Sequence, residues 1–285
     1  MRSLVVRLSS CPRRTPLHSP SAMARHALRP HEFKVLLRLR QQDPAVRVGS
    51  HRDLRRFRHG VHSLLRTGIP WRDLPRRFGH GNSLFRRDRR GCLAGVWERL
   101  AAACAEERAQ PCRVHLDTTP VRSHPVSAGA GRDQGSQDAQ AQGRSRGGFG
   151  TKLHVLVDAQ GGLRACCLTP GQAHDRPQAE GLREGVRPDS VLADRSYDDD
   201  DLRRYIVAQG AEPVIPGRRH RREPIAYDRV LYRERNLVER SIGWLKQGRR
   251  MATRYEKTAA SYLGFVLFAA ARHWLRNPFA NVHTP

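Results

Sequence analysis

The sequence predicts an α/β fold in which a mixed sheet flanked by helices follows a small all-helical N-terminal domain. Two apolar runs, 153–157 and 163–168, flank the turn-forming segment 158–162, a pattern typical of a β-hairpin. From residue 176 onward, helix and strand patterns alternate, and this order suits a mixed sheet with helices packed on it. Before residue 100, apolar side chains recur at helix spacing instead.

Composition divides the chain into three parts. Residues 1–22 hold three prolines and no periodic pattern, which predicts a disordered leader or a start codon assigned too early, with translation beginning at Met23. Residues 23–108 form the basic helical domain, in which helix spacing is clearest at Val35, Leu36, Leu39, Phe57, Val61, Leu64 and Leu65. Residues 109–285 form the domain that contains the sheet.

Each element of the sheet domain has a local signal. The expected strands are short apolar runs: 114–117, 153–157, 163–168, 191–193 and 212–215. The expected helices are 176–185, 198–209, 231–247 and 259–275. Residues 127–150 are rich in Gly, Ser, Gln and Arg, which predicts a flexible loop.

The chain is strongly basic, with 52 Lys and Arg against 27 Asp and Glu and a net charge of +25. Such an excess is typical of proteins that bind nucleic acid, because it is attracted to phosphate groups. Only four of the basic residues are lysine, and a GC-rich genome also favours arginine. That bias does not account for the shortage of acids, so we expect a DNA or RNA partner.

Nothing in the sequence predicts a membrane or a disulfide framework. The longest apolar stretch, 263–275, contains Arg272 and His273 and is too short and too polar to cross a bilayer. None of the six cysteines forms a C-x-x-C pair, which argues against a structural zinc site. We therefore expect no membrane association and a reducing, cytoplasmic location.

Two aspartates, Asp117 and Asp194, each follow a predicted strand. A carboxylate just past a buried strand is held rigidly at the sheet edge, where open α/β sheets place their sites. A single such aspartate is more often a turn residue. The acids at 198–201 and Asp175 compete for the same role, but a helix start and a loop turn explain them well.

A third acid, Glu239, lies on a predicted helix with a polar face. Tyr232, Arg235, Glu239 and Lys246 fall within about 60° of one another around the helix axis. A solvated charged face with an Arg235–Glu239 pair is the plain alternative. Three carboxylates that meet at a sheet edge suit Mg²⁺ or Mn²⁺, and two such ions can drive phosphodiester cleavage.

These residues carry a resemblance to a known family. Residues 232–246 match Tyr-x2-Arg-x3-Glu-x6-Lys, and the chain resembles the DDE transposases of bacterial insertion sequences over about residues 23–276. Further matching segments are 68–75, 143–148, 151–154, 170–175, 193–198 and 249–257.

The resemblance implies a ribonuclease H-like core and DNA transposition. In this interpretation Asp117, Asp194 and Glu239 are the catalytic acids and hold two divalent ions, Mg²⁺ or Mn²⁺. The residues expected to contact DNA are Tyr232, Arg235, Lys246, Arg144, Arg146 and Lys152. The expected partners are the double-stranded inverted-repeat ends, which the helical domain binds, and target DNA. We expect a homodimer, because two ends must be joined, acting at the bacterial nucleoid.

The chain departs from the family pattern at several positions. Arg195-Ser196 replaces the usual Lys-Gly, and a glycine there matters only if its φ is positive. Tryptophans expected near Gly81 and Gly91 are absent, which predicts a hollowed helical domain. Three alternatives remain: an inactive or domesticated transposase that only binds DNA, a nuclease that hydrolyses without joining, and an RNA-binding protein, for which 6% aromatic residues are few.

Overall fold

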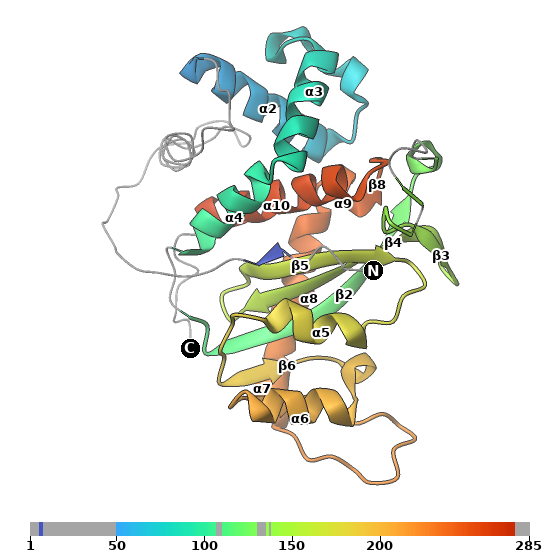
Figure 1. Ribbon diagram of the computed structural model, residues 1–285. Helices are drawn as coiled ribbons and strands as arrows, with labels where there is room; N and C mark the ends of the chain where they lie inside the picture. The colour runs from blue at the N-terminus through green and yellow to red at the C-terminus, as the bar shows by residue number, and fades with distance from the viewer. Residues whose placement is uncertain (1–5, 8–49, 107–109, 130–134, 137, 277–285) are drawn as a thin grey trace.

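An eight-stranded sheet is the centre of the computed structural model, which describes residues 6–7, 50–106, 110–129, 135–136 and 138–276 (Figure 1). The strands are β1 (Val6–Arg7), β2 (Arg113–Ser123), β3 (Gly143–Ser145), β4 (Gly148–Asp158), β5 (Leu163–Pro170), β6 (Ser190–Leu192), β7 (Glu212–Val214) and β8 (Thr253–Arg254). Six of them lie side by side in the order β1-β5-β4-β2-β6-β7, while β3 pairs with β4 and β8 with β2.

The sheet is mixed, as the sequence predicts. Strand β4 runs antiparallel to both β2 and β5, whereas β6 is parallel to β2 and β7 is parallel to β6. The antiparallel hairpin forms from local sequence, and the parallel strands need the helical connections that follow it. This ribonuclease H-like arrangement confirms the predicted fold class.

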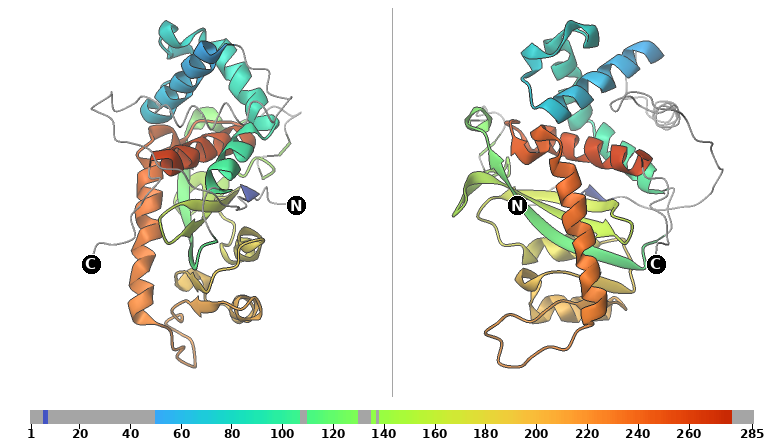
Figure 2. Two further views of the ribbon diagram at one scale, coloured as in Figure 1. Left: turned by 90° about the vertical axis from the view of Figure 1, so that its left-hand side faces the viewer. Right: turned by 180° about the vertical axis from the view of Figure 1, so that it is seen from behind.

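Helices cover both faces of the sheet. They are α2 (His51–Thr67), α3 (Gly81–Leu93), α4 (Val96–Glu106), α5 (Arg176–Arg183), α6 (Asp200–Ala208), α7 (Arg229–Tyr232), α8 (Asn236–Lys246), α9 (Arg249–Ala252) and α10 (Ala259–Arg276). Figure 2 shows α8 on one side of the sheet and α5 and α6 on the other. In the part of the chain that the structure describes, no helix is both long and apolar enough to span a lipid bilayer.

Two hydrophobic clusters lie on the two faces of the sheet. Val155 and Val157 of β4 belong to the cluster that includes α4, α8 and α10, whereas Leu156 belongs to the cluster of α5 and α6. Successive side chains of a strand point to opposite faces, and cross-strand partners share a face. Because Asp117 pairs with Val155 and Thr118 pairs with His154, Asp117 points toward α8 and Thr118 toward α5.

The N-terminal helices pack directly on the C-terminal helix α10. Trp97 of α4 lies 5.0 Å from Phe268 and 6.4 Å from Phe57 between ring centroids. A Cβ on Gly81 would lie 2.0 Å from the carbonyl oxygen of Trp71, so glycine fits this position and a larger residue does not. The helical part therefore has its own aromatic packing despite the missing tryptophans.

Several local predictions are confirmed. The helix spacing predicted at Phe57, Val61, Leu64 and Leu65 corresponds to α2, which ends at Thr67 and is capped by Gly68 at a φ of 71°. The predicted hairpin is β4–β5, and the predicted helices 176–185, 198–209 and 259–275 correspond to α5, α6 and α10 within a few residues.

Other local predictions are wrong. Asp117 does not end a strand, because β2 continues to Ser123 by pairing with the first half of β4. Part of the predicted loop 127–150 is strand β3 and the start of β4, which form a tight hairpin. The predicted helix 231–247 contains a 3₁₀ turn, η6 (Arg233–Arg235).

Some predictions fall outside the described residues. The helix expected around Val35 is one of them. The predicted disordered leader is another, except that Val6–Arg7 pairs with β5 as strand β1, contrary to that prediction.

Candidate active site

Asp117 is a mostly buried carboxylate in the middle of β2. Its side chain is 12% exposed, and its Oδ1 accepts a hydrogen bond of 2.8 Å from the Thr118 amide. Burial raises the pKa of Asp117, while the nearby Arg235 opposes the rise and the charges of Asp194 and Glu239 add to it. Asp194 and Glu239 therefore both lie within electrostatic reach of Asp117.

Arg235 bridges two of these acids. Its Nη2 lies 3.2 Å from Oδ2 of Asp117, and its Nη1 lies 2.6 Å from Oε1 of Glu239. The buried Nε of Arg235 has no hydrogen-bond partner in the structure. The pair with Glu239 is the one that helix spacing alone predicts, but the contact with Asp117 joins the helix to the sheet. The polar face is therefore not simply a solvated surface.

Asp194 follows β6 and begins the 3₁₀ turn η5 (Arg195–Tyr197). Its Oδ1 accepts a hydrogen bond of 2.9 Å from the Ser196 amide, and the Ser196 hydroxyl donates to the same oxygen. Within the described chain the only non-glycine residue with positive φ is Ala141, so Ser196 is not strained by replacing the family's glycine. The serine instead adds a second donor to the carboxylate.

The other two residues of the polar helix face lie close to this group. Lys246 donates from Nζ to the carbonyl oxygen of Pro120 at 3.1 Å, and burial lowers its pKa. Burial raises the pKa of Tyr232, and Asp194 and Arg235 are both near enough to influence it. Tyr232 therefore lies near Arg235 and Asp194, while Lys246 contacts β2 three residues beyond Asp117.

The competing acids have other partners. Asp198 is bound by Arg203 and Arg221, at 2.8 and 3.0 Å, and Asp199 caps α6 through the Leu202 amide. Asp200 pairs with Arg221, and Asp201 pairs with Arg204. These contacts place the acids at 198–201 in ion pairs and helix capping and leave Asp194 as the acid of this segment whose charge raises the pKa of Asp117.

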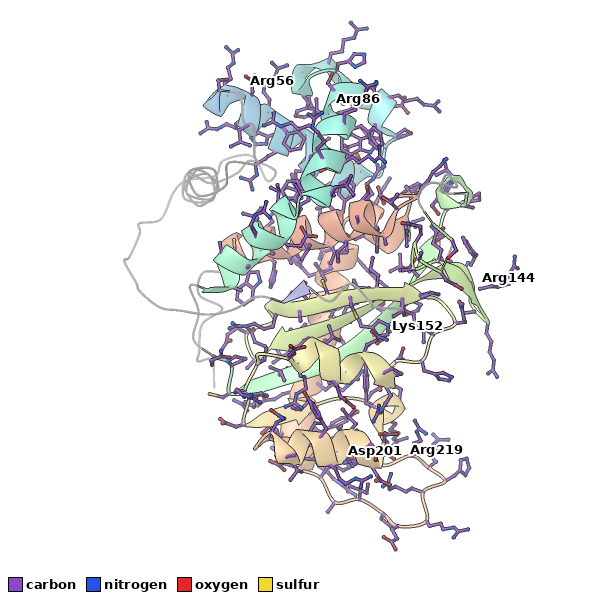
Figure 3. All side chains as sticks on the ribbon, in the orientation of Figure 1. Arg56, Arg86, Arg144, Lys152, Asp201 and Arg219 are labelled. Atoms are coloured by element: carbon purple, nitrogen blue, oxygen red, sulfur yellow. The ribbon has the colours of Figure 1, made fainter. Side chains whose placement is uncertain are left out.

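Lys152 lies on the opposite face of the sheet from Asp117. Its Nζ contacts Asp175 Oδ1 at 2.9 Å and the Ala173 carbonyl oxygen at 2.7 Å. Register explains the placement, because Lys152 pairs with Pro120 and so shares the face of Thr118. Arg144 and Arg146 are exposed on the β3–β4 hairpin, and Figure 3 shows Arg144 projecting into solvent.

A buried chain of hydrogen bonds joins the segments that carry the two aspartates, and the sequence did not reveal it. The Tyr197 hydroxyl lies 2.7 Å from the Thr118 hydroxyl, which lies 2.8 Å from Nδ1 of His154. Nε2 of His154 lies 2.8 Å from the Thr169 hydroxyl, which donates to the Pro170 carbonyl oxygen. Burial lowers the pKa of His154 to about 4, so its ring is neutral.

His115 is a second residue that sequence reasoning missed. It is fully buried in β2 two positions before Asp117 and on the same face, and neither ring nitrogen has a hydrogen-bond partner in the structure. Burial lowers its pKa to about 4. The alternation of β2 was the available signal, but a buried histidine is usually assigned to the core.

The three acids form a donor set that suits a hard divalent cation, since carboxylate oxygens are its preferred ligands. Among the described residues, however, no three His, Cys, Asp or Glu side chains are grouped closely enough to hold a metal ion together. The guanidinium of Arg235 supplies positive charge between Asp117 and Glu239 instead. The three acids thus fit a divalent metal ion in the chemistry of their donor atoms, while the guanidinium of Arg235 lies between two of them.

Two family models match the chain. Residues 108–274 match the model described as "Transposase DDE domain", and residues 31–101 match "Putative transposase of IS4/5 family". The first covers more than half of the chain and contains all three acids.

Individual relatives have the same kind of description. "Putative transposase for insertion sequence element IS6501" of Brucella ovis is 41% identical over 128 residues, which are 44% of this chain and 98% of that relative. "Putative transposase for insertion sequence element IS402" of Burkholderia cepacia is 33% identical, over 41% of this chain and 59% of that relative. "Transposase for insertion sequence element IS1106" of Neisseria meningitidis serogroup B is 28% identical, over 50% of this chain and 51% of that relative.

Proposed function

Since the chain belongs to the transposases that have a DDE domain, we propose that it moves an insertion sequence with Asp117, Asp194 and Glu239 as its catalytic acids. It cuts a DNA strand at each terminal inverted repeat and joins the freed 3′-hydroxyl to target DNA. In the first step water attacks a phosphodiester and the 3′-oxygen leaves. In the second step that 3′-hydroxyl attacks a phosphodiester of the target, and the target strand's own 3′-oxygen leaves.

The bridge made by Arg235 is the observation that carries this proposal. It brings a strand residue, Asp117, and a helix residue, Glu239, to one cation, with Asp194 close enough to affect the pKa of Asp117. Carboxylates are brought together in this way at a cost, because their charges repel one another. A structural role does not require the third acid at all.

Divalent metal ions serve this family, and we propose that Asp117, Asp194 and Glu239 hold Mg²⁺ or Mn²⁺, two ions in all. Bound there, the metal supplies Lewis-acid activation of the attacking oxygen and stabilises the leaving one. Asp117 is held by β2 and by the Thr118 amide, and Asp194 by two donors from Ser196. These hydrogen bonds orient the carboxylates before DNA arrives.

The basic residues around the acids hold DNA in this proposal. Arg235 and Lys246 lie on the same helical run as Glu239, and a phosphate of the cleaved strand would accept hydrogen bonds from them. Tyr232 lies next to them and Arg144 and Arg146 extend the basic surface from the β3–β4 hairpin. Lys152 is not part of this DNA surface, because it lies on the opposite face of the sheet and its ammonium is already paired with Asp175.

We also propose that residues 23–108 act as the DNA-end-binding domain and that two copies of the chain act together. Joining two ends in one complex requires two active sites, and a homodimer supplies them. The dimer works on chromosomal DNA, which places it at the nucleoid in the bacterial cytoplasm. Light scattering of the protein with paired ends would show two chains, and a single chain would contradict the dimer.

The test is strand transfer on a duplex that carries the inverted repeat flanking the gene, with Mg²⁺ and a second DNA as target. Transfer of the cut end by the parent and none by Glu239→Gln is the expected result. Glu234→Gln is the matched control, because Glu234 lies on the same helical run and pairs with Arg113 instead, at 2.7 Å. It should keep the parent's activity.

The other outcomes separate the alternatives. Cleavage without transfer in any condition would make the protein a nuclease. Binding of the duplex by a folded protein that neither cuts nor joins would make it a DNA-binding protein only. Equal loss in Glu239→Gln and Glu234→Gln would remove the assignment of Glu239.

A further inference from the structure

The helical part of the chain presents a strongly basic outer surface at the far end of the molecule from α6 (Figure 1). Between residues 52 and 105 two acids are exposed, Asp53 and Asp73. The exposed arginines of the same segment are Arg52, Arg55, Arg56, Arg72, Arg76, Arg77, Arg86, Arg89, Arg90 and Arg99. A surface with this imbalance attracts a polyanion.

Helix α3 divides its side chains sharply between inside and outside. Leu84, Asp88 and Cys92 are buried, so the one acid of the helix faces inward. The exposed residues are Asn82, Ser83, Phe85, Arg86, Arg89, Arg90 and Leu93. At about 100° per residue, Asn82, Arg86, Arg89 and Leu93 fall within about 60° of one another and form one line along the helix.

This line has the chemistry of a base-reading surface. In the major groove, Asn bonds adenine, Arg bonds guanine and apolar side chains contact the thymine methyl. Leu93 is 68% exposed, which places an apolar group on the same face as Arg86 and Arg89. A surface that only neutralises phosphate needs no amide and no exposed leucine.

The dimensions also fit. Asn82 and Leu93 are about 16 Å apart along the helix at 1.5 Å per residue, which corresponds to about five base-pair steps of 3.4 Å. A B-DNA major groove about 12 Å wide admits one helix of this kind.

Neighbouring elements carry further exposed arginines, whose chemistry suits contacts to phosphate. Arg52 lies in the first turn of α2, and Arg76 and Arg77 lie in the 3₁₀ turn η2 (Arg76–Phe78). Arg56 donates from Nε to the Arg77 carbonyl oxygen at 3.1 Å, which holds α2 and η2 in fixed relation. Figure 3 shows Arg56 and Arg86 together at this outer end.

The outer surface is fixed relative to the acids. Phe85 of α3 packs edge-on against Trp71 at 5.7 Å between centroids. Arg250, which follows α8, donates to the Ile69 carbonyl oxygen at 2.6 Å and to Glu256 at 2.5 Å, and its guanidinium lies 5.9 Å from the Trp71 ring. A helix held in this way sets a constant spacing between a recognised sequence and the cleavage point.

We propose that the exposed face of α3 reads base edges in the major groove of the terminal inverted repeat, with Asn82, Arg86 and Arg89 as its specificity-determining residues. The inference rests on the proposed transposase function, which supplies the DNA. It assigns sequence recognition to one face of one helix and leaves the remaining arginines of the surface to hold phosphates.

Fluorescence anisotropy with the full chain carrying Glu239→Gln, in Mg²⁺-free buffer at several salt concentrations, tests the proposal. The probes are a duplex with the flanking inverted repeat and a shuffled duplex of equal composition. Asn82→Ala should lower the preference for the repeat roughly tenfold and leave the salt slope unchanged. Arg76→Gln is the matched control for a phosphate contact. It should weaken binding to both duplexes alike and lower the salt slope of binding by about one.

The proposal is overturned if the parent prefers neither duplex, or if Asn82→Ala and Arg86→Gln both behave like Arg76→Gln. Both altered side chains are exposed, and circular dichroism confirms that the variants fold. If the protein with Glu239 intact cleaves at the repeat while the α3 variants keep the preference for it, that result overturns this inference and leaves the transposase function standing. If Asn82→Ala loses the preference for the repeat but the protein with Glu239 intact never cleaves DNA, the inference about α3 is supported and the proposed function is refuted.

Discussion

The buried hydrogen-bond chain of Tyr197, Thr118 and His154 makes a sharp energetic prediction. A neutral His154 carries one ring proton. With the proton on Nε2, His154 donates to Thr169, whose hydroxyl donates onward to Pro170, and accepts from Thr118 through Nδ1. In this arrangement Thr118 accepts from the hydroxyl of Tyr197, a residue that is 1% exposed. Thr118 is thus the central link.

Replacing Thr118 by Val keeps the shape and removes the link. Two buried groups, the Tyr197 hydroxyl and Nδ1 of His154, then lack a partner, at about 1–3 kcal/mol each. The free energy of unfolding should fall by about 2–6 kcal/mol. Replacing Tyr197 by Phe in the parent should cost only about 1 kcal/mol. In the Thr118→Val background the same change should stabilise the protein, because it removes an unpaired hydroxyl.

Urea unfolding followed by circular dichroism measures both effects through the transition midpoint. Tyr205→Phe is the control, since Tyr205 packs against the same cluster from α6 and takes no part in the chain. If Tyr197→Phe destabilises both backgrounds equally, the hydroxyls do not form a connected chain and the reasoning fails. The outcome bears on the active site because Thr118 follows Asp117 and Tyr197 ends the turn that Asp194 begins.

Three further changes test other parts of the structure. Arg235→Gln removes the cation between two carboxylates, so Mn²⁺ should bind the DNA-free protein roughly tenfold more tightly, and unchanged affinity by electron paramagnetic resonance would argue against the bridge. Burial, aided by Glu256, raises the pKa of Asp88 to about 7. The unfolded chain releases this proton near pH 4, so stability should fall from about pH 4 to pH 7. Asp88→Asn should abolish that loss and raise the free energy of unfolding at pH 8 by on the order of 1–4 kcal/mol, as unfolding at several pH values would show. Lys152→Met should cost about 1 kcal/mol through loss of the half-buried pair with Asp175, with an unchanged salt slope of DNA binding; a smaller slope would return Lys152 to the DNA surface.

Local patterns predicted much of this fold, because the hairpin and the alternating helices depend on neighbouring residues. The length of β2 could not be predicted, since Thr118 to Ser123 includes Pro120 and is held in the sheet by distant residues of β4. The contact of Arg235 with Asp117 is equally non-local, and helix spacing showed only the pair with Glu239.

Lys152 shows where a signal was present and not used. Leu153, Val155 and Val157 alternate with Lys152 and His154, and this period of two places the lysine on the face opposite the apolar cluster of α8. Residues matched to a family pattern can therefore lie on different faces of the sheet. Odd or even position along a strand separates the residues that share the face of Asp117 from the residues on the opposite face of the sheet.

The assignment of the metal-holding acids is tested most directly by changing the ligand and the metal together. Thiolate is a softer ligand than carboxylate and suits Mn²⁺ better than Mg²⁺. Asp194→Cys should therefore lose strand transfer in Mg²⁺ and recover it in Mn²⁺, while Asp175→Cys, which alters an acid paired with Lys152, should respond to both ions as the parent does. Full activity of Asp194→Cys in Mg²⁺, or no activity of the folded variant with either ion, would contradict a metal bound by Asp194.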